Sequence, residues 1–225
     1  LDMKDILIMS LVNKLFNVLS KSDTLWKPIY ENKFTMITFK KNYYEEYKKC
    51  YILNKFLCNH NKNINDIIER LYLQYNSLQT IPPEIGQINT LQLLDLSHNN
   101  LQTIPPEIGN LKMLRILYLN DNNLQSIPPE IGQLKILNLL WLNNNNLQLI
   151  PPEIGQLKML QTFYLHENNL QTIPPEIGKL EMLKDLNLHS NKLELIPSEI
   201  GKLSKLENLS LSNNNLQSIP PEIGK

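Results

Sequence analysis

The chain has 225 residues with 22 basic and 22 acidic side chains, so its formal net charge is zero. This balance disfavours nucleic-acid binding, which depends on attraction to phosphate. No apolar run is long enough to cross a bilayer, and no phosphate loop, nucleophile elbow or zinc-ligand motif indicates an enzyme. We therefore expect no cofactor, no nucleic-acid partner and no membrane partner.

Residues 1–66 contain no glycine and a single proline, Pro28. Between Asp5 and Leu19 the apolar residues recur at helical spacing and give a wide helical face. Residues 42–58 predict a further helix, after a break near Ser22. The sequence thus predicts a small all-α module of two to four helices, which also caps the apolar end of the region that follows.

Residues 1–34 resemble the later part of an F-box. The matching letters are Leu1-Asp2, Asp5-Ile6-Leu7, Ser10-Leu11-Val12, Phe16, Leu25-Trp26-Lys27 and Tyr30. The opening Leu-Pro helix of that motif is missing from the match. The resemblance implies docking to a Skp-type linker of a cullin ubiquitin ligase, with an apolar helix face entering a groove of the partner. The residues expected to contact the linker are Leu7, Leu11, Val12 and Leu15.

Residues 67–225 repeat one pattern every 23 residues. A fixed period of this size predicts a solenoid, in which each unit buries its apolar face by stacking on its neighbours. Within one unit, Leu117 and Leu119 alternate around Tyr118, as in a strand with one buried face. The phrase LQTIPPEIG or a near-copy of it begins at Leu78, Leu101, Leu124, Leu147, Leu170, Leu193 and Leu216.

Three features of the unit are expected to maintain the fold and not to bind a partner. The glycine that ends each copy predicts a backbone position with positive φ or a close approach of another chain segment. The proline-rich PPEIG segment predicts an irregular convex return, either polyproline II or a short 3₁₀ turn. One asparagine per unit predicts a ladder that satisfies inward-facing backbone groups. These asparagines are Asn76, Asn99, Asn122, Asn145, Asn168, Asn191 and Asn214.

The unit LxxLxLxxNxLxxIPPEIGxLxx resembles the leucine-rich repeat family over residues 68–225. The resemblance implies an α/β fold, a right-handed solenoid of seven repeats with a parallel sheet on its concave side. The repeats are like those of intracellular Ras-pathway scaffolds and unlike the longer, cysteine-containing repeats of most F-box proteins of this kind. No capping helix follows the seventh copy, so we expect truncation at Lys225 or burial of that end against another copy.

Function is expected where the units differ, on the outward side of the strands. One outward column reads Tyr72, Asp95, Tyr118, Trp141, Tyr164, Asn187 and Ser210. An aromatic and apolar patch with a polar rim is typical of an interface, although cross-strand pairs can also simply stabilise a sheet. The residues predicted to bind a protein partner are Tyr72, Leu93, Asp95, Ile116, Tyr118, Asp121, Leu139, Trp141, Asn143, Tyr164, His166 and Glu167.

Histidine and cysteine give weaker signals. His166 and His189 occupy equivalent positions in adjacent units, near Glu167 and Asp185. Such a set can hold a metal or titrate near neutral pH, but histidines on a repeat surface usually do neither, so no metal site is predicted.

Cys50 and Cys58 would lie about 12 Å apart on one helix, too far for a disulfide. This favours a reducing, intracellular location, cytoplasmic or nuclear.

The sequence therefore predicts a non-catalytic protein-interaction protein. The leading hypothesis is a substrate adaptor of a cullin-type ubiquitin ligase, in which the repeat face holds the target. One alternative is an intracellular scaffold or signalling regulator whose helical region is only a cap. A secreted or surface protein of adhesion or immunity is a further alternative, which the cysteine content disfavours.

Overall fold

The computed structural model describes residues 69–223. The chain divides between Asn65 and Asp66, and the described residues belong to the second unit. The helical module and the F-box-like segment predicted for residues 1–66 lie outside the described residues, as do Leu7, Leu11, Val12 and Leu15.

Seven short strands alternate with six 3₁₀ helices along the described chain. The strands are β1 (Arg70–Tyr72), β2 (Leu93–Asp95), β3 (Ile116–Tyr118), β4 (Leu139–Trp141), β5 (Thr162–Tyr164), β6 (Asp185–Asn187) and β7 (Asn208–Ser210). The 3₁₀ helices are η2 (Pro83–Gln87), η3 (Pro106–Asn110), η4 (Pro129–Gln133), η5 (Pro152–Gln156), η6 (Pro175–Lys179) and η7 (Ser198–Lys202).

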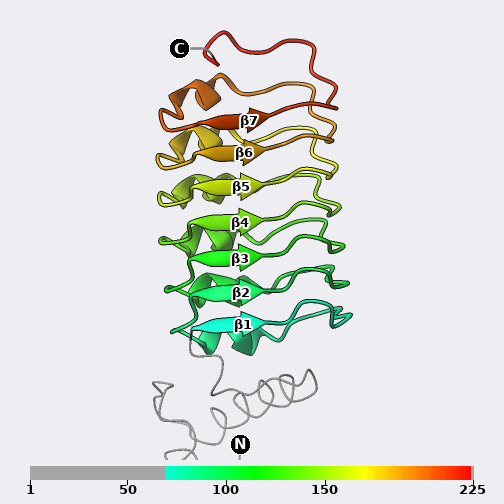
Figure 1. The fold of residues 1–225 in the computed structure, drawn as a ribbon, viewed down its shortest axis with the longest axis vertical. Helices are drawn as coiled ribbons and strands as arrows, with labels where there is room; N and C mark the ends of the chain where they lie inside the picture. The colour runs from blue at the N-terminus through cyan, green and yellow to red at the C-terminus, as the bar shows by residue number, and fades with distance from the viewer. Residues whose placement is uncertain (1–68, 224–225) are drawn as a thin grey trace, which may run out of the picture. The chain divides into compact units, whose positions relative to one another are not determined.

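The strands form one parallel sheet in strict chain order, from β1 to β7. Each residue pairs with the residue one period further along, as Leu94 pairs with Leu117 and Leu117 with Leu140. Figure 1 shows the strands as successive rungs, with the 3₁₀ helices on the return path behind them. The predicted parallel sheet of seven repeats is therefore confirmed.

The core lies between the strands and the return segments. The middle residue of each strand points inward, and Leu94, Leu117, Leu140 and Phe163 are fully buried. Ile108 and Ile131 reach the same core from the 3₁₀ helices and are also fully buried. Burial of this apolar surface drives the stacking, because a single unit has no partner for its inner face.

Each return segment uses both conformations that its prolines suggested. Pro128 is extended, with φ −69° and ψ 145°, close to polyproline II, and the 3₁₀ helix η4 begins at the next residue. Proline is tolerated at this first helical position because its missing N–H would have no partner there. At the other end, the backbone N–H of Leu134 donates to the carbonyl of Ile131.

The repeated glycine serves close packing, and the positive-φ alternative is wrong for it. Among the described residues no glycine has positive φ. A Cβ added to Gly132 would instead lie 2.5 Å from the carbonyl oxygen of Glu153 in the next unit. Positive φ occurs one residue before the repeated asparagine, for example at Asp121 (54°) and Asn144 (53°).

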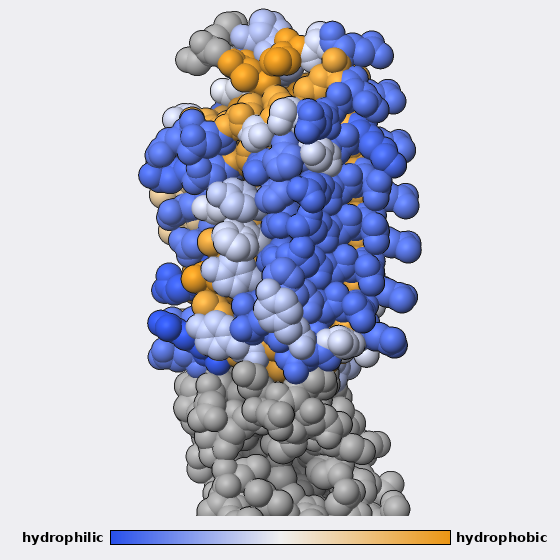
Figure 2. Space-filling view, turned by 45° about the vertical axis from the view of Figure 1, so that its right-hand side comes forward, coloured by the Kyte–Doolittle hydropathy of each residue, from blue (hydrophilic) through white to orange (hydrophobic). Residues whose placement is uncertain are grey.

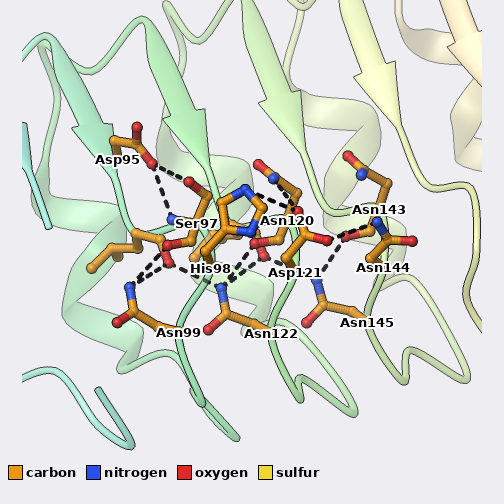
Figure 3. A network of polar contacts seen from close by, with 12 residues as sticks. Asp95, Ser97, His98, Asn99, Asn120, Asp121, Asn122, Asn143, Asn144 and Asn145 are labelled. Carbon is orange, nitrogen blue, oxygen red and sulfur yellow. Dashed lines mark hydrogen bonds and ion pairs between the residues drawn. The ribbon is translucent and has the colours of Figure 1, made fainter. Parts of the chain in front are cut away.

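The repeated asparagines form the predicted ladder, and Figure 3 shows Asn99, Asn122 and Asn145 in one row. The Asn145 amide donates to the carbonyls of Leu119, Leu142 and Asn143, at 2.9, 3.1 and 3.3 Å. Its Oδ1 accepts the backbone N–H of Leu124 at 2.9 Å. One buried side chain thus satisfies backbone groups of its own unit and of the preceding unit.

Among residues 69–223 no helix is long and apolar enough to span a membrane.

Candidate functional site

Three aromatic side chains stand in a row on the outer face of the sheet. Tyr118, Trp141 and Tyr164, here called the aromatic row, end three adjacent strands and pair with one another across β3, β4 and β5. The rings of Tyr118 and Trp141 meet edge to face with centroids 4.8 Å apart. Trp141 and Tyr164 stack with centroids 5.5 Å apart. The continuous stripe predicted from the sequence is therefore present.

The three side chains of the aromatic row are half-buried. Neighbouring rings cover one another, and the column of Leu93, Ile116 and Leu139 lies beside them on the same face. Figure 2 shows a pale column, the colour of tyrosine and tryptophan, with hydrophobic atoms on one side and a hydrophilic surface on the other. Because the neighbouring rings already hold one another, these side chains form a rigid apolar surface that would lose little conformational entropy on binding.

Tyr72 and Asp95 extend the same column toward the first repeat. Tyr72 is 37% exposed, and Asp95 separates it from the aromatic row. Burial raises the pKa of the Tyr118 phenol, and the charges of Asp95 and Tyr72 raise it further. The Asp95 carboxylate accepts hydrogen bonds from both the backbone N–H and the hydroxyl of Ser97, which fixes its direction.

A second line of side chains runs beside the aromatic row, two residues further along each repeat. We call it the polar row, and it consists of Ser97, Asn120, Asn143, His166 and His189. Asn120 and Asn143 are each only 8% exposed. Nevertheless, Oδ1 of both asparagines and Nδ1 of His166 have no hydrogen-bond partner among the described residues.

Trp141 shares this property, since its indole Nε1 is buried and also lacks a partner among the described residues. A buried polar atom without a partner costs about 1–3 kcal/mol, so native proteins keep few of them. Here four such atoms lie in adjacent repeats on one face. They comprise two amide acceptors, an indole donor and an imidazole nitrogen.

The rim of the face is ordered by Asp121. Its carboxylate accepts hydrogen bonds from Asn120 Nδ2 at 2.6 Å and Asn144 Nδ2 at 2.7 Å, and it lies 3.5 Å from His98 Nε2. Figure 3 shows these groups, which come from three successive repeats, around the Asp121 carboxylate. Asp121 is predicted to contact a partner, and its contacts within the protein also hold the side chains of Asn120 and Asn144 in place.

The two histidines of the polar row lie together. The His166 and His189 rings stack with centroids 4.7 Å apart and planes inclined by 18°. Ligand atoms of His166, Glu167 and His189 all lie within 4.8 Å of one another. Asp185, which the sequence placed nearby, is outside this group and accepts a hydrogen bond from Asn208. Burial lowers the pKa of His166, and the neighbouring His189 lowers it further.

The structure thus joins most of the predicted contact residues on one face, through the aromatic row and its flanks. It also brings to this face Asn120, which the sequence places on the polar rim, and Ser97 and His189, which the sequence does not predict to bind a partner. Their signal was the shared offset of two residues from the variable strand position. It also adds a stacked pair, Tyr75 and His98, with centroids 4.3 Å apart.

Family models match all the described repeats. The leucine-rich repeat region model matches residues 107–192 and 129–225, and the leucine rich repeat model matches residues 68–124. No curated protein matches the chain in a sequence comparison.

Solved structures similar to this chain also contain leucine-rich repeats. A leucine-rich repeat protein of Leptospira interrogans is 36% identical over 77% of this chain and 48% of that protein, with a TM-score of 0.56. The ectodomain of the Arabidopsis thaliana receptor kinase GASSHO1/SCHENGEN3, in complex with CASPARIAN STRIP INTEGRITY FACTOR 2, is 36% identical, with a TM-score of 0.62. That match covers 66% of this chain and 18% of the receptor.

The plant peptide hormone receptor RGFR1, in complex with RGF2, is 35% identical over 69% of this chain and 26% of the receptor, with a TM-score of 0.62. The chain therefore spans about half of the bacterial protein and a smaller share of each receptor. The repeat period, the asparagine ladder, the family models and these structures agree, and the chain belongs to the leucine-rich repeat family.

Proposed function

We propose that the outer face of the sheet binds an extended segment of a protein partner. The observation that carries this proposal is the group of buried polar atoms without partners beside the aromatic row. Rotation of these side chains can expose the buried atoms to the backbone N–H and C=O groups of an extended segment, while an apolar side chain of that segment packs on Trp141. The leucine-rich repeat fold is a protein-interaction scaffold, which supports the same role.

Two of the similar structures agree with this proposal. Both are complexes, one of GASSHO1/SCHENGEN3 with CASPARIAN STRIP INTEGRITY FACTOR 2 and one of a plant peptide hormone receptor with RGF2. Those ligands belong to those receptors. For the present chain they support only the general inference that a solenoid of these repeats presents a surface for a polypeptide.

The test begins with peptides selected from a random displayed library on the intact chain. We expect Trp141→Ala to weaken binding of a selected peptide by about 30-fold, because truncation of a central aromatic residue typically costs about 2 kcal/mol. Leu149→Ala is the matched control, since Leu149 is an exposed apolar side chain, at 54%, in a return segment. Equal binding by wild type and Trp141→Ala, with a lower melting temperature in the variant, would assign the row to sheet stability alone.

We further propose that the repeat face delivers its partner to a ubiquitin ligase, in an intracellular compartment. Support for this finer role comes from the F-box-like letters between Leu1 and Tyr30. The test is capture of a Skp-type linker by the intact chain, which Leu11→Asp is expected to abolish while peptide binding to the repeats persists. Absence of linker binding by the wild-type chain would leave the alternative of a scaffold or signalling regulator.

A further inference from the structure

We propose that His166, Glu167 and His189 form a binding site for a zinc ion on the outer face of the sheet. The three residues come from two adjacent repeats, and their ligand atoms lie within 4.8 Å of one another. This inference does not depend on the peptide-binding role proposed above, because the ion alone is the ligand.

The backbone fixes the spacing of the two imidazoles. Each histidine lies two residues beyond a paired strand residue, His166 beyond Tyr164 and His189 beyond Asn187. The Glu167 N–H donates to the His189 carbonyl at 3.1 Å, which links the two turns directly. The group is therefore held in place by backbone pairing, and only the side-chain torsions remain to be set.

Those torsions need only a small change. Two ligands of one tetrahedral zinc ion, each about 2.0–2.1 Å from the metal, lie about 3.3 Å apart. The present separations of up to 4.8 Å exceed that value by up to about 1.5 Å, a difference that rotation about the side-chain torsions can close. Glu167 is exposed and both histidines are half-buried, so the rotation requires no change in the core.

Hydrogen bonding prepares the histidines for a metal. His189 Nδ1 lies 2.9 Å from the hydroxyl of Ser190, and a proton donated there leaves the lone pair on Nε2. Contacts of this kind to the second ring nitrogen are the usual support of a zinc-bound histidine. The buried Nδ1 of His166 has no partner among the described residues, so no hydrogen bond described here has to be broken for that ring to turn.

The ligand set selects the class of metal. Two imidazoles and a carboxylate favour zinc and neighbouring transition ions over magnesium and calcium, which prefer oxygen ligands. Three protein ligands leave the fourth tetrahedral position of the zinc for water or for a group from a partner. Tyr164 stands beside His166, with ring centroids 5.9 Å apart, so the site adjoins the end of the aromatic row.

The experiment is a calorimetric titration of the metal-free intact chain with zinc, and with magnesium as the comparison ion. Cys50, Cys58 and His60 can also bind zinc, so the result is read as a difference between variants. In His189→Asn the polar row receives the residue that it already carries at Asn120 and Asn143, which should keep the fold. His98→Asn is the matched control, because His98 is another repeat histidine near a carboxylate and outside the group.

We expect wild type and His98→Asn to bind one zinc ion more than His189→Asn, in the micromolar range, and magnesium to give no such difference. Glu167→Gln should weaken this binding by at least tenfold, and Ser190→Ala by about tenfold through loss of the outer hydrogen bond. Proton resonances of both imidazoles should shift with zinc in the wild-type chain. Identical zinc stoichiometry and affinity in wild type and His189→Asn would overturn the proposal.

Discussion

Asn143 and Asn145 stand two residues apart in the same repeat and are buried to nearly the same degree, at 8% and 7% exposure. The Asn145 amide and carbonyl are both hydrogen-bonded to the backbone, whereas Asn143 Oδ1 has no partner among the described residues. Identical side chains thus belong to two different regions, the ladder and the outer face. Burial alone does not distinguish the framework from the proposed binding surface, whereas the presence or absence of hydrogen-bond partners separates these two asparagines.

Substitutions on the inner and outer sides of the sheet should differ most in their cost to unfolding free energy within β5. Phe163 points inward and is fully buried, and Tyr164 follows it on the outer face. Phe163→Ala should cost about 4 kcal/mol of unfolding free energy, because it leaves a cavity in the core. Tyr164→Ala should cost about 1 kcal/mol or less, the scale of a cross-strand pair. Urea unfolding followed by circular dichroism measures both, and equal losses would contradict the division.

The next largest difference in unfolding free energy is expected between alanine substitutions of Asn145 and Asn143. Asn145→Ala should cost about 3 kcal/mol, because it leaves backbone groups of two repeats without partners. Asn143→Ala removes an atom that already lacks one, and it should cost less than about 1 kcal/mol. The same urea unfolding experiment decides between them. A cost for Asn143→Ala that matches that of Asn145→Ala would place Asn143 in the framework.

Substitution of the repeated glycine tests how closely neighbouring repeats pack. Gly132→Ala would bring a Cβ to 2.5 Å from the Glu153 carbonyl oxygen and 3.0 Å from its Cβ. Overpacking of this kind costs about 2 kcal/mol, and thermal unfolding should show a lower melting temperature. Ser126→Ala, at an exposed position of the same repeat, is the control and should change stability by less than about 0.5 kcal/mol. A neutral Gly132→Ala would show that the units separate easily.

The smallest expected effect concerns alkaline pH. The pKa of Tyr118 is raised above its ordinary value of 10.0, first by burial and then by Asp95 and Tyr72. The unfolded chain therefore loses this proton at a lower pH than the folded chain does, and stability falls as pH rises past about 10. Tyr118→Phe should reduce this fall in urea unfolding measured at several pH values. Parallel curves for the two proteins would contradict the shift.

Much of this fold follows from the sequence because one period fixes many contacts. The 23-residue spacing sets the strand register, and alternation around Leu117 and Leu119 sets the two sides of the sheet. The asparagine ladder and the proline-rich return follow from the same repetition. Each of these features depends on residue type and position alone, without knowledge of side-chain torsions.

Other features could not be predicted in this way. The position with positive φ is occupied by His98, Asp121, Asn144, Glu167 and Ser190, so no single residue type marks it. Half-burial of the aromatic row depends on how three neighbouring rings cover one another. The missing partners of Asn120 Oδ1 and Asn143 Oδ1 depend on rotamer and environment, and they distinguish the proposed binding surface from the framework.

The ladder's hydrogen bonds between repeats join residues 21, 23 or 26 positions apart, so each of these bonds links only neighbouring repeats. Duplication or loss of one whole repeat would preserve every such bond elsewhere in the stack. A change in the number of repeats would therefore leave the framework contacts within the remaining stack intact. Each added copy would bring two more outward strand positions, equivalent to Leu139 and Trp141, so the length of the proposed recognition surface can vary separately from its chemistry.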